Sequence, residues 1–169
     1  MAGASGVGTV LIQMCKWAGA SSIAVCSSWE KLERCKSLGS FDGINHKQTP
    51  NYQERLALIT DGEGVDVLLD PVCASFFNCN LECLGMDSRW VIYGTMGGIK
   101  IQDANMAKLI SKRASILTST LRNRTDEYKR NLILDMERDC FPGFKSGDLN
   151  PIIDKSFDLT DASSALSYM

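Results

Sequence analysis

Apolar residues recur along the chain with two periods, and segments of the two kinds alternate. In the first segment the spacings are three and four residues, which is typical of one face of a helix, and Gly19 is expected to end that helix. The positions concerned are Val7, Val10, Leu11, Met14 and Ala18. The run Ile23–Cys26 that follows is short and apolar, which predicts a buried strand.

The same alternation continues to the end of the sequence. It predicts helices over 29–38, from 49 onward, at Phe77, Leu81 and Leu84, over 105–111, over 126–138 and from 160 onward. It predicts strands over 41–44, 65–70, 89–94 and 115–119, a last short strand at 152–153, and a loop over 142–151. This order indicates an α/β fold with a doubly wound parallel (Rossmann-like) sheet, in which right-handed crossovers place helices on both faces.

The glycine-rich opening is the segment that most clearly indicates chemistry. Its residues are Gly3, Ser5, Gly6, Val7 and Gly8, with Ala4 between the first two. In such a turn one glycine permits a tight bend and another lets the backbone approach a pyrophosphate, while the helix start offers free N–H groups. The spacing G-x-x-G-x-G differs from the usual G-x-G-x-x-G, so alone it fits either a phosphate-binding turn or an incidental flexible start. The strands and helices downstream favour the phosphate-binding turn.

The position of this turn in the chain has a consequence for the sheet. A dinucleotide-binding turn normally follows a strand, and here only Met1 and Ala2 precede it. In a doubly wound sheet the strand before the turn is the central one. We therefore expect a sheet that lacks its first central strand and, because the chain stops inside a helix, its C-terminal end. Residues 1–169 are interpreted as one dinucleotide-binding domain, present as a fragment.

The residues after the first expected strand bear on which dinucleotide binds. NAD enzymes usually place an Asp or Glu there, which accepts a hydrogen bond from the ribose 2′-OH. Here Ser27 and Ser28 follow and then Lys31, a set that suits a 2′-phosphate better. His46, just past the next strand, is a further candidate contact, with an ordinary loop side chain as the alternative. Glu30 favours NAD, but the balance favours NADPH.

Charge and cysteine content narrow the expected partners and location. The 18 Lys and Arg residues against 20 Asp and Glu residues give a net charge of -2, which offers no basic excess for DNA or an anionic membrane. The seven cysteines are an odd number without a signal-peptide pattern before them, which indicates reduced thiols and a cytoplasmic location, with an organelle matrix as the alternative. No apolar run approaches the roughly 20 residues of a membrane span.

Five segments carry a resemblance to a known family. They lie at 2–9, 31–32 with 38–39, 89–94, 96–98 and 118–122. Over nearly the whole chain the sequence resembles the cofactor-binding half of zinc-independent quinone oxidoreductases in the medium-chain dehydrogenase/reductase superfamily. Within that family it is most similar to the tumour-suppressor-inducible branch and more distantly similar to the zeta-crystallin branch.

The resemblance implies NADPH-dependent reduction of quinones by hydride or electron transfer from the nicotinamide, with no catalytic acid or base nominated in the protein. It implies that residues 5–7 hold the pyrophosphate and that Ser28, Lys31 and His46 lie at the 2′-phosphate. It places Tyr93, Gly94, Thr95, Thr120 and Leu121 beside the nicotinamide. It also implies a homodimer, and a substrate slot formed largely by an N-terminal barrel-like domain that this chain lacks.

One departure from the family pattern and three other interpretations remain. Close relatives carry glycines where this chain has Cys73 and Ala74, so crowding of the cofactor ribose is expected there. A zinc site is not expected, because the seven cysteines form no C-x-x-C pair and the only histidine is distant from them in sequence. RNA binding is permitted by the zeta-crystallin resemblance, but the basic residues form no concentrated stripe. An inert fragment is the third alternative, and the chain alone is expected to be aggregation-prone and inactive as a quinone reductase.

Overall fold

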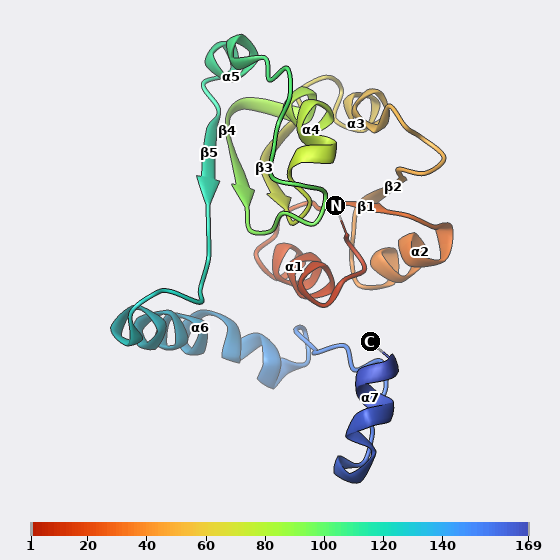
Figure 1. Ribbon diagram of the computed structural model, residues 1–169, viewed down its shortest axis with the longest axis vertical. Helices are drawn as coiled ribbons and strands as arrows, with labels where there is room; N and C mark the ends of the chain where they lie inside the picture. Colours follow the sequence, from red (N-terminus) through yellow and green to blue (C-terminus); the bar gives the residue numbers. More distant parts are fainter. Residues whose placement is uncertain (1, 169) are drawn as a thin grey trace.

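Helices and strands alternate from α1 to β5 in the computed structural model, which describes residues 2–168 (Figure 1). The helices are α1 (Gly6–Trp17), α2 (Trp29–Ser37), α3 (Tyr52–Ile59), α4 (Phe77–Cys83), α5 (Met106–Lys112), α6 (Asp126–Ser146) and α7 (Ala162–Tyr168). The strands are β1 (Ile23–Cys26), β2 (Asp42–Asn45), β3 (Val65–Asp70), β4 (Leu84–Ile92) and β5 (Ser115–Thr118). Short 3-10 turns, η1 (Ala74–Phe76) and η2 (Leu159–Asp161), precede α4 and α7.

The strands form two parallel sheets, β1–β2 and β3–β4–β5. Lined up as β2-β1-gap-β3-β4-β5, they have the order of a doubly wound fold without the strand that precedes the phosphate-binding turn. The fold class predicted from the sequence is therefore confirmed, and no strand of residues 2–168 lies in the place between β1 and β3. The glycine turn itself meets the edge of β1, because the Gly3 N–H donates to the Val25 carbonyl at 3.1 Å.

Side chains of β1 alternate between two hydrophobic layers, as expected when helices cover both faces of a sheet. Ala24 and Cys26 face α1 and α2, and their cluster is completed by Ile12, Leu32 and Cys35. Val25 faces the other way, into a cluster with Ile44, Tyr52, Leu56 and Cys83. Leu68 of β3 packs against that second cluster, so one hydrophobic layer joins the two sheets where no backbone pairing does.

Three sequence predictions for element boundaries are wrong. The predicted helix over 126–138 continues to Ser146 and contains Pro142, so the first half of the predicted loop over 142–151 is helical instead. A proline removes one helical hydrogen bond, but this helix is long and closed at both ends, by the Thr125 cap and by Gly147 at φ 84°. The predicted strand at 152–153 is absent from the described chain, and Leu84 begins β4 instead of continuing the preceding helix.

The segment from α6 to α7 lies apart from the two sheets (Figure 1). Its link to α1 runs through Gln13, whose Nε2 donates to the Asn150 carbonyl at 3.0 Å and whose Oε1 accepts from the Asn150 N–H at 2.8 Å. Leu149 is buried close to Gly143 of α6. Among the helices of the described chain, none combines the length and the apolar character needed to cross a membrane.

Candidate functional site

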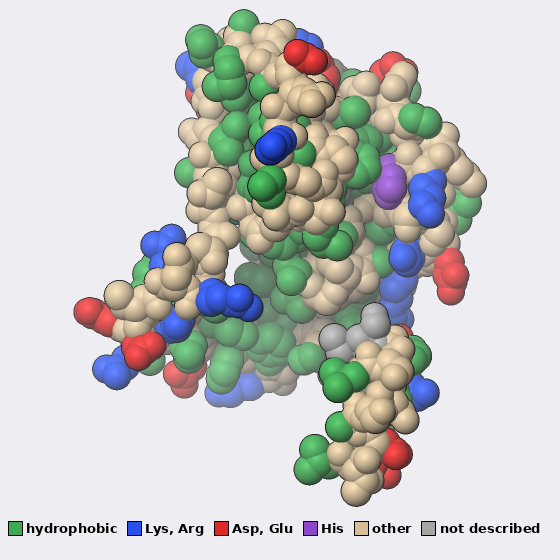
Figure 2. Space-filling view, viewed as in Figure 1, with side chains coloured by type: hydrophobic (Ala, Val, Ile, Leu, Met, Phe, Trp, Pro, Cys, Tyr) green, Lys and Arg blue, Asp and Glu red, His purple; other side chains and the backbone are tan. Residues whose placement is uncertain are grey.

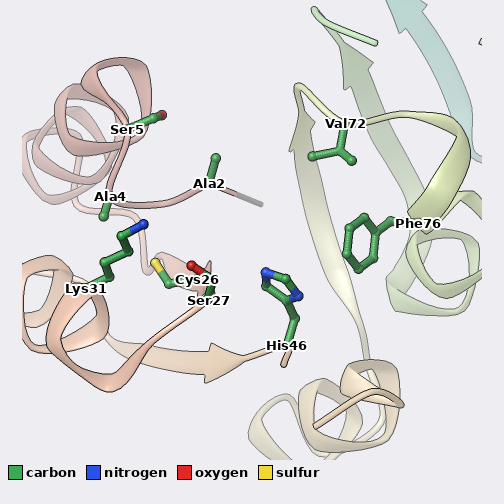
Figure 3. A pocket seen from close by; sticks show the side chains of 9 residues that line it. All are labelled: Ala2, Ala4, Ser5, Cys26, Ser27, Lys31, His46, Val72 and Phe76. Carbon is green, nitrogen blue, oxygen red and sulfur yellow. The ribbon is translucent and has the colours of Figure 1, made fainter. Parts of the chain in front are cut away.

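A cavity of about 260 Å³ lies between the start of α1 and the ends of β1, β2 and β3 (Figure 3). Its lining consists of Ala2, Ala4, Ser5, Cys26, Ser27, Lys31, His46, Val72 and Phe76. Three of the predicted site residues, Ser5, Lys31 and His46, therefore come together from separate elements. Doubly wound folds bind ligands at the carboxyl ends of their parallel strands, which is where this cavity lies.

The start of α1 leaves hydrogen-bond donors free beside the cavity. The Ser5 hydroxyl accepts from the Gly8 N–H at 3.1 Å and the Ser5 carbonyl accepts from the Thr9 N–H at 2.9 Å. Gly6 and Val7 form the first two positions of the helix, so their N–H groups have no acceptor within it. Together with the positive end of the helix dipole, these N–H groups suit an anion such as a pyrophosphate.

The glycines of the turn differ in what they contribute. A Cβ on Gly8 would lie 2.4 Å from the Gly3 carbonyl oxygen, a distance that side-chain carbons do not reach, so Gly8 permits the close approach of helix and turn. A Cβ on Gly3 would lie 3.0 Å from the Ala24 Cβ. A Cβ on Gly6 would meet nothing within 4 Å, which leaves open space where a ligand can approach the backbone.

The residues predicted for a 2′-phosphate lie at the start of α2. Ser28 is the N-cap of this helix, and its hydroxyl accepts from the Lys31 N–H at 3.3 Å. Ser27, not Ser28, lines the cavity. The Lys31 side chain takes part in none of the ion pairs formed within residues 2–168, so its ammonium group is available to an anion in the cavity.

His46 faces Lys31 across the cavity (Figure 3). The His46 ring lies edge-on to the Phe76 ring, with the two ring centroids 5.3 Å apart. The backbone N–H of His46 donates to the Cys26 carbonyl at 3.0 Å. Burial lowers the pKa of His46 below its usual value, and the charge of Lys47 lowers it further. At neutral pH the ring is therefore mostly uncharged, and a phosphate placed beside it would raise its pKa. Figure 2 shows the histidine, in purple, with Lys and Arg side chains next to it on the surface.

A buried carboxylate holds the loop that forms the opposite wall. Asp70, at the end of β3, accepts from the N–H groups of Val72 at 2.7 Å and Cys73 at 3.0 Å. Its other oxygen accepts from Asn80 Nδ2 at 2.9 Å and Trp90 Nε1 at 3.2 Å. With four donors and no exposed surface, Asp70 fixes the chain that carries Val72 into the cavity.

Cys73 of the same loop has a backbone conformation that favours glycine. Its φ is 67° with ψ -114°, a region that costs a residue with a Cβ roughly 1–3 kcal/mol. This agrees with the sequence-based expectation that relatives carry glycine there. The thiol is buried, and neither Cys73 nor Ala74 lines the cavity. The departure from the family pattern therefore takes the form of backbone strain at Cys73.

The residues predicted to lie beside the nicotinamide follow β4 and β5, outside the lining of the cavity. They are Tyr93, Gly94, Thr95, Thr120 and Leu121. The Tyr93 N–H donates to the Asp70 carbonyl at 3.0 Å, and a Cβ on Gly94 would lie 2.6 Å from the Pro71 oxygen. The segment after β4 therefore packs on the Asp70 loop, whereas Thr120 and Leu121 are exposed beyond β5. All five lie at the carboxyl ends of parallel strands, the same side as the cavity.

Sequence reasoning missed several contributors to this site. Cys26, Val72 and Phe76 line the cavity, and Asp70 holds the loop that carries Val72. The available signal was the position of Asp70 at the end of a clearly predicted strand, directly before Pro71. The contact between Phe76 and His46 joins residues 30 positions apart, and no local pattern indicates it.

The described residues do not provide a zinc site. No group of three or more His, Cys, Asp or Glu side chains in residues 2–168 is placed to hold a metal ion. Cys79 and Cys83 are one turn apart on α4, but both pKa values are raised by burial, which disfavours the thiolate that zinc requires. Independence from zinc stays a prediction.

The chain is similar to oxidoreductases along most of its length. The zinc-binding dehydrogenase family matches residues 6–136. A 2-haloacrylate reductase of Burkholderia sp. is 28% identical over 174 residues, covering 99% of this chain and 50% of that protein. A quinone oxidoreductase of Pseudomonas aeruginosa is 27% identical over 165 residues, covering 97% of this chain and 50% of that protein.

Solved structures give the same picture. The Escherichia coli quinone oxidoreductase complexed with NADPH matches with a TM-score of 0.76 and 25% identity, covering 90% of this chain and 46% of that one. A 2-haloacrylate reductase structure matches with a TM-score of 0.76 and 27% identity, covering 99% of this chain and 52% of that one. The chain therefore spans about half the length of the relatives that it matches.

Proposed function

The chain belongs to the zinc-binding dehydrogenase family, and we propose that it forms the NADPH-binding domain of a quinone oxidoreductase. Its resemblance to the cofactor-binding half of medium-chain dehydrogenases/reductases, predicted from the sequence, is confirmed. One observation carries the proposal. The glycine turn, Lys31 and His46 line one cavity at the carboxyl ends of parallel strands, where a dinucleotide is expected.

The choice of NADPH over NADH rests on the charges around the cavity. Lys31 is a cation in the cavity lining, and Ser27 and Ser28 stand at the strand end where an NAD enzyme usually has an acid. Ser27 adds a hydroxyl in the lining, and His46 adds a ring that gains positive charge when an anion approaches. Glu30 is exposed on α2 and is absent from the lining, so it offers the ribose no acceptor there.

In this proposal the bound cofactor supplies a hydride or an electron, and the chain binds and orients it. The N–H groups of Gly6 and Val7 hold the pyrophosphate, and Lys31 and His46 hold the 2′-phosphate. The Asp70 loop and the segment Tyr93, Gly94 and Thr95 direct the nicotinamide, and Thr120 and Leu121 extend this wall. No side chain of the domain is assigned a catalytic acid or base role, since hydride transfer asks the protein mainly for orientation.

The substrate class, the assembly and the location belong to the same proposal. A quinone is favoured because proteins named quinone oxidoreductase recur among the relatives and the solved structures. A second candidate is an activated alkene acid, which the similarity to a 2-haloacrylate reductase over 99% of the chain favours. We further propose a cytoplasmic homodimer in which another domain completes the substrate slot.

The cofactor assignment is tested by titrating NADPH and NADH into the chain and into two variants. Lys31→Ala should weaken NADPH binding by about tenfold or more, because a charge-assisted contact to phosphate contributes roughly 1.5–3 kcal/mol. NADH binding should change little. Lys36→Ala is the matched control, since Lys36 lies exposed at the other end of α2 and outside the cavity lining. Equal losses for both cofactors in Lys31→Ala would contradict the assignment.

The substrate class is tested on the chain joined to the N-terminal barrel-like domain that the family resemblance implies. Consumption of NADPH is followed with a simple quinone and with 2-chloroacrylate, and the chain of 169 residues is assayed in parallel. We expect turnover with the quinone by the longer protein and little by the chain alone. Turnover with the chloroacrylate only would favour the second candidate, and binding of RNA in place of NADPH would favour the non-catalytic alternative.

A further inference from the structure

Two buried thiols touch directly beneath the glycine turn. Cys26 ends β1 and Cys35 lies on α2, and their Sγ atoms are 3.7 Å apart. Cys26 is 3% exposed and Cys35 is fully buried. A Cβ on Gly3 would lie 3.3 Å from the first sulfur and 3.4 Å from the second, so both sulfurs are in contact range of the turn.

We propose that Cys26 and Cys35 are a site of reversible oxidation, which forms a disulfide in response to a peroxide and weakens dinucleotide binding. The weakening of dinucleotide binding rests on the proposed function, whereas the formation of the disulfide does not. The sulfurs need to approach by about 1.6 Å to reach the usual S–S bond length of about 2.05 Å. Both lie in one hydrophobic cluster between β1 and α2, so the approach needs a shift of α2 against the end of β1.

Cys26 is the thiol that reacts first. The hydrogen bond from Cys35 lowers the pKa of Cys26 to about 6, and backbone N–H groups of Ala4 and Gly3 act in the same direction. The same hydrogen bond raises the pKa of Cys35. Cys26 is buried but lines the cavity, and in this proposal the cavity is the route by which a small oxidant reaches its sulfur.

The chemistry balances with hydrogen peroxide as the oxidant. The Cys26 thiolate attacks one oxygen, the O–O bond breaks, and a sulfenic acid and hydroxide form. The Cys35 sulfur then attacks the sulfenic sulfur, the S–O bond breaks, and the S–S bond forms. The proton of Cys35 and the proton released earlier by Cys26 leave in water. Two thiols thus lose two electrons in total, and one peroxide becomes two water molecules.

The position of the pair links this oxidation to the cavity. Cys35 lies on the helix that carries Lys31, and Cys26 directly precedes Ser27 of the lining. Drawing the sulfurs together moves α2 relative to the end of β1 and to the turn at Gly3, which abuts both sulfurs. The anion-binding groups on the two elements then lose their relative placement, so the oxidised chain should bind NADPH less well.

Other thiols of the chain serve as internal controls. Burial raises the pKa of Cys15, Cys79 and Cys83, which disfavours their reaction with peroxide. Within residues 2–168 the sulfurs of Cys26 and Cys35 are the one pair in hydrogen-bond contact. Cys83 is 1% exposed and packs in the other hydrophobic layer, so Cys83→Ala removes a comparably buried thiol away from the turn.

The disulfide is tested by mass spectrometry of the chain after a brief exposure to dilute hydrogen peroxide and alkylation of the remaining thiols. We expect a peptide pair joined through Cys26 and Cys35 with the loss of two hydrogens, which disappears on treatment with dithiothreitol. The pair should form in Cys83→Ala and should be absent from Cys35→Ala and Cys26→Ala. A folded wild-type chain without this linkage, or with faster oxidation at the half-buried thiol Cys140, would overturn the proposal.

The consequence for binding is tested by NADPH titration of the reduced and the peroxide-treated chain. Oxidation should weaken binding at least tenfold in the wild type and in Cys83→Ala, and dithiothreitol should restore it. Cys35→Ala should show the same affinity before and after treatment. Equal affinity for the reduced and the disulfide-linked chain overturns the coupling. A reduced chain that does not bind NADPH overturns the proposed function and the coupling together, while the linkage is decided by mass alone.

Discussion

The sheet body, residues 2–118, and the C-terminal arm, residues 126–168, use their apolar residues in opposite ways. In the body these residues form three buried clusters around the strands, and the ends of those strands carry the cavity. In the arm the apolar side chains of α6 and α7 are largely exposed, with Ile133 at 63% and Leu166 at 73%. Burial fixes the backbone much more in the first region than in the second, where Leu149 is the one buried apolar side chain among the described residues, so we expect the functional residues to depend on the body.

The largest effect should come from removing the most buried ring of the body. Trp90 is fully buried, packs on Phe77 with the ring centroids 4.6 Å apart, and donates to Asp70. Trp90→Ala should lower the free energy of unfolding by about 3–5 kcal/mol, because it leaves a void in the core and removes the indole N–H that donates to Asp70. Chemical denaturation measures this. Trp17→Ala is the matched control, because Trp17 is 43% exposed, and a similar loss there would break the distinction.

The next effect separates two glycines of the same turn. Gly8→Ala places a Cβ 2.4 Å from the Gly3 oxygen, so the turn must shift, at a cost of roughly 1–3 kcal/mol in folding stability. NADPH binding should be lost as well. Gly6→Ala meets open space and should leave the free energy of unfolding nearly unchanged. Thermal denaturation and titration of both variants decide this, and equal stabilities would show that the turn is not tightly packed.

A smaller effect tests the strained backbone in the Asp70 loop. Cys73→Gly and Cys73→Ala both remove the thiol, but only the glycine relieves the positive φ of 67°. The glycine variant should therefore be the more stable of the two by about 1 kcal/mol, against the usual disadvantage of glycine. Denaturation curves of the two variants give this difference directly. A more stable alanine variant would mean that the loop relaxes at no cost.

The smallest effect is expected in the arm. Ile133→Ala on α6 should change the free energy of unfolding by about 0.5 kcal/mol or less, because the side chain is 63% exposed and alanine favours a helix. The same denaturation experiment checks this. A loss comparable to that of Trp90→Ala would show that the arm is packed in solution and would remove the contrast between the regions.

The same contrast explains how much the sequence could predict. In the body, β1 and β3 lie at the predicted positions because short apolar runs and glycine stops are local signals. The glycine turn and Lys31 were likewise found from local patterns. In the arm the sequence predicted a loop at Pro142, where the helix instead continues to Ser146. Pro142 disfavours helix, but it did not end α6, because that helix is capped by Thr125 at its start and by Gly147 at its end.

The parts of the site that the sequence did not indicate depend on long-range contacts. Phe76 reaches His46 only because β3 and β2 end on the same side of the sheets. Burial lowers the pKa of His46, and burial depends on that packing, so a histidine expected as a direct phosphate contact is mostly uncharged at neutral pH. Ser28 was predicted at the phosphate, but capping of α2 engages its hydroxyl and Ser27 lines the cavity.

The central claim is that this cavity holds the 2′-phosphate of NADPH beside Lys31 and His46. His46 is the only histidine in the sequence, so its ring proton signals in an NMR pH titration are unambiguous. Without a ligand its pKa should lie below the usual value. Saturation with NADPH should raise this pKa, because a phosphate dianion stabilises the charged ring, and saturation with NADH should not. The same pKa with both cofactors would contradict the claim.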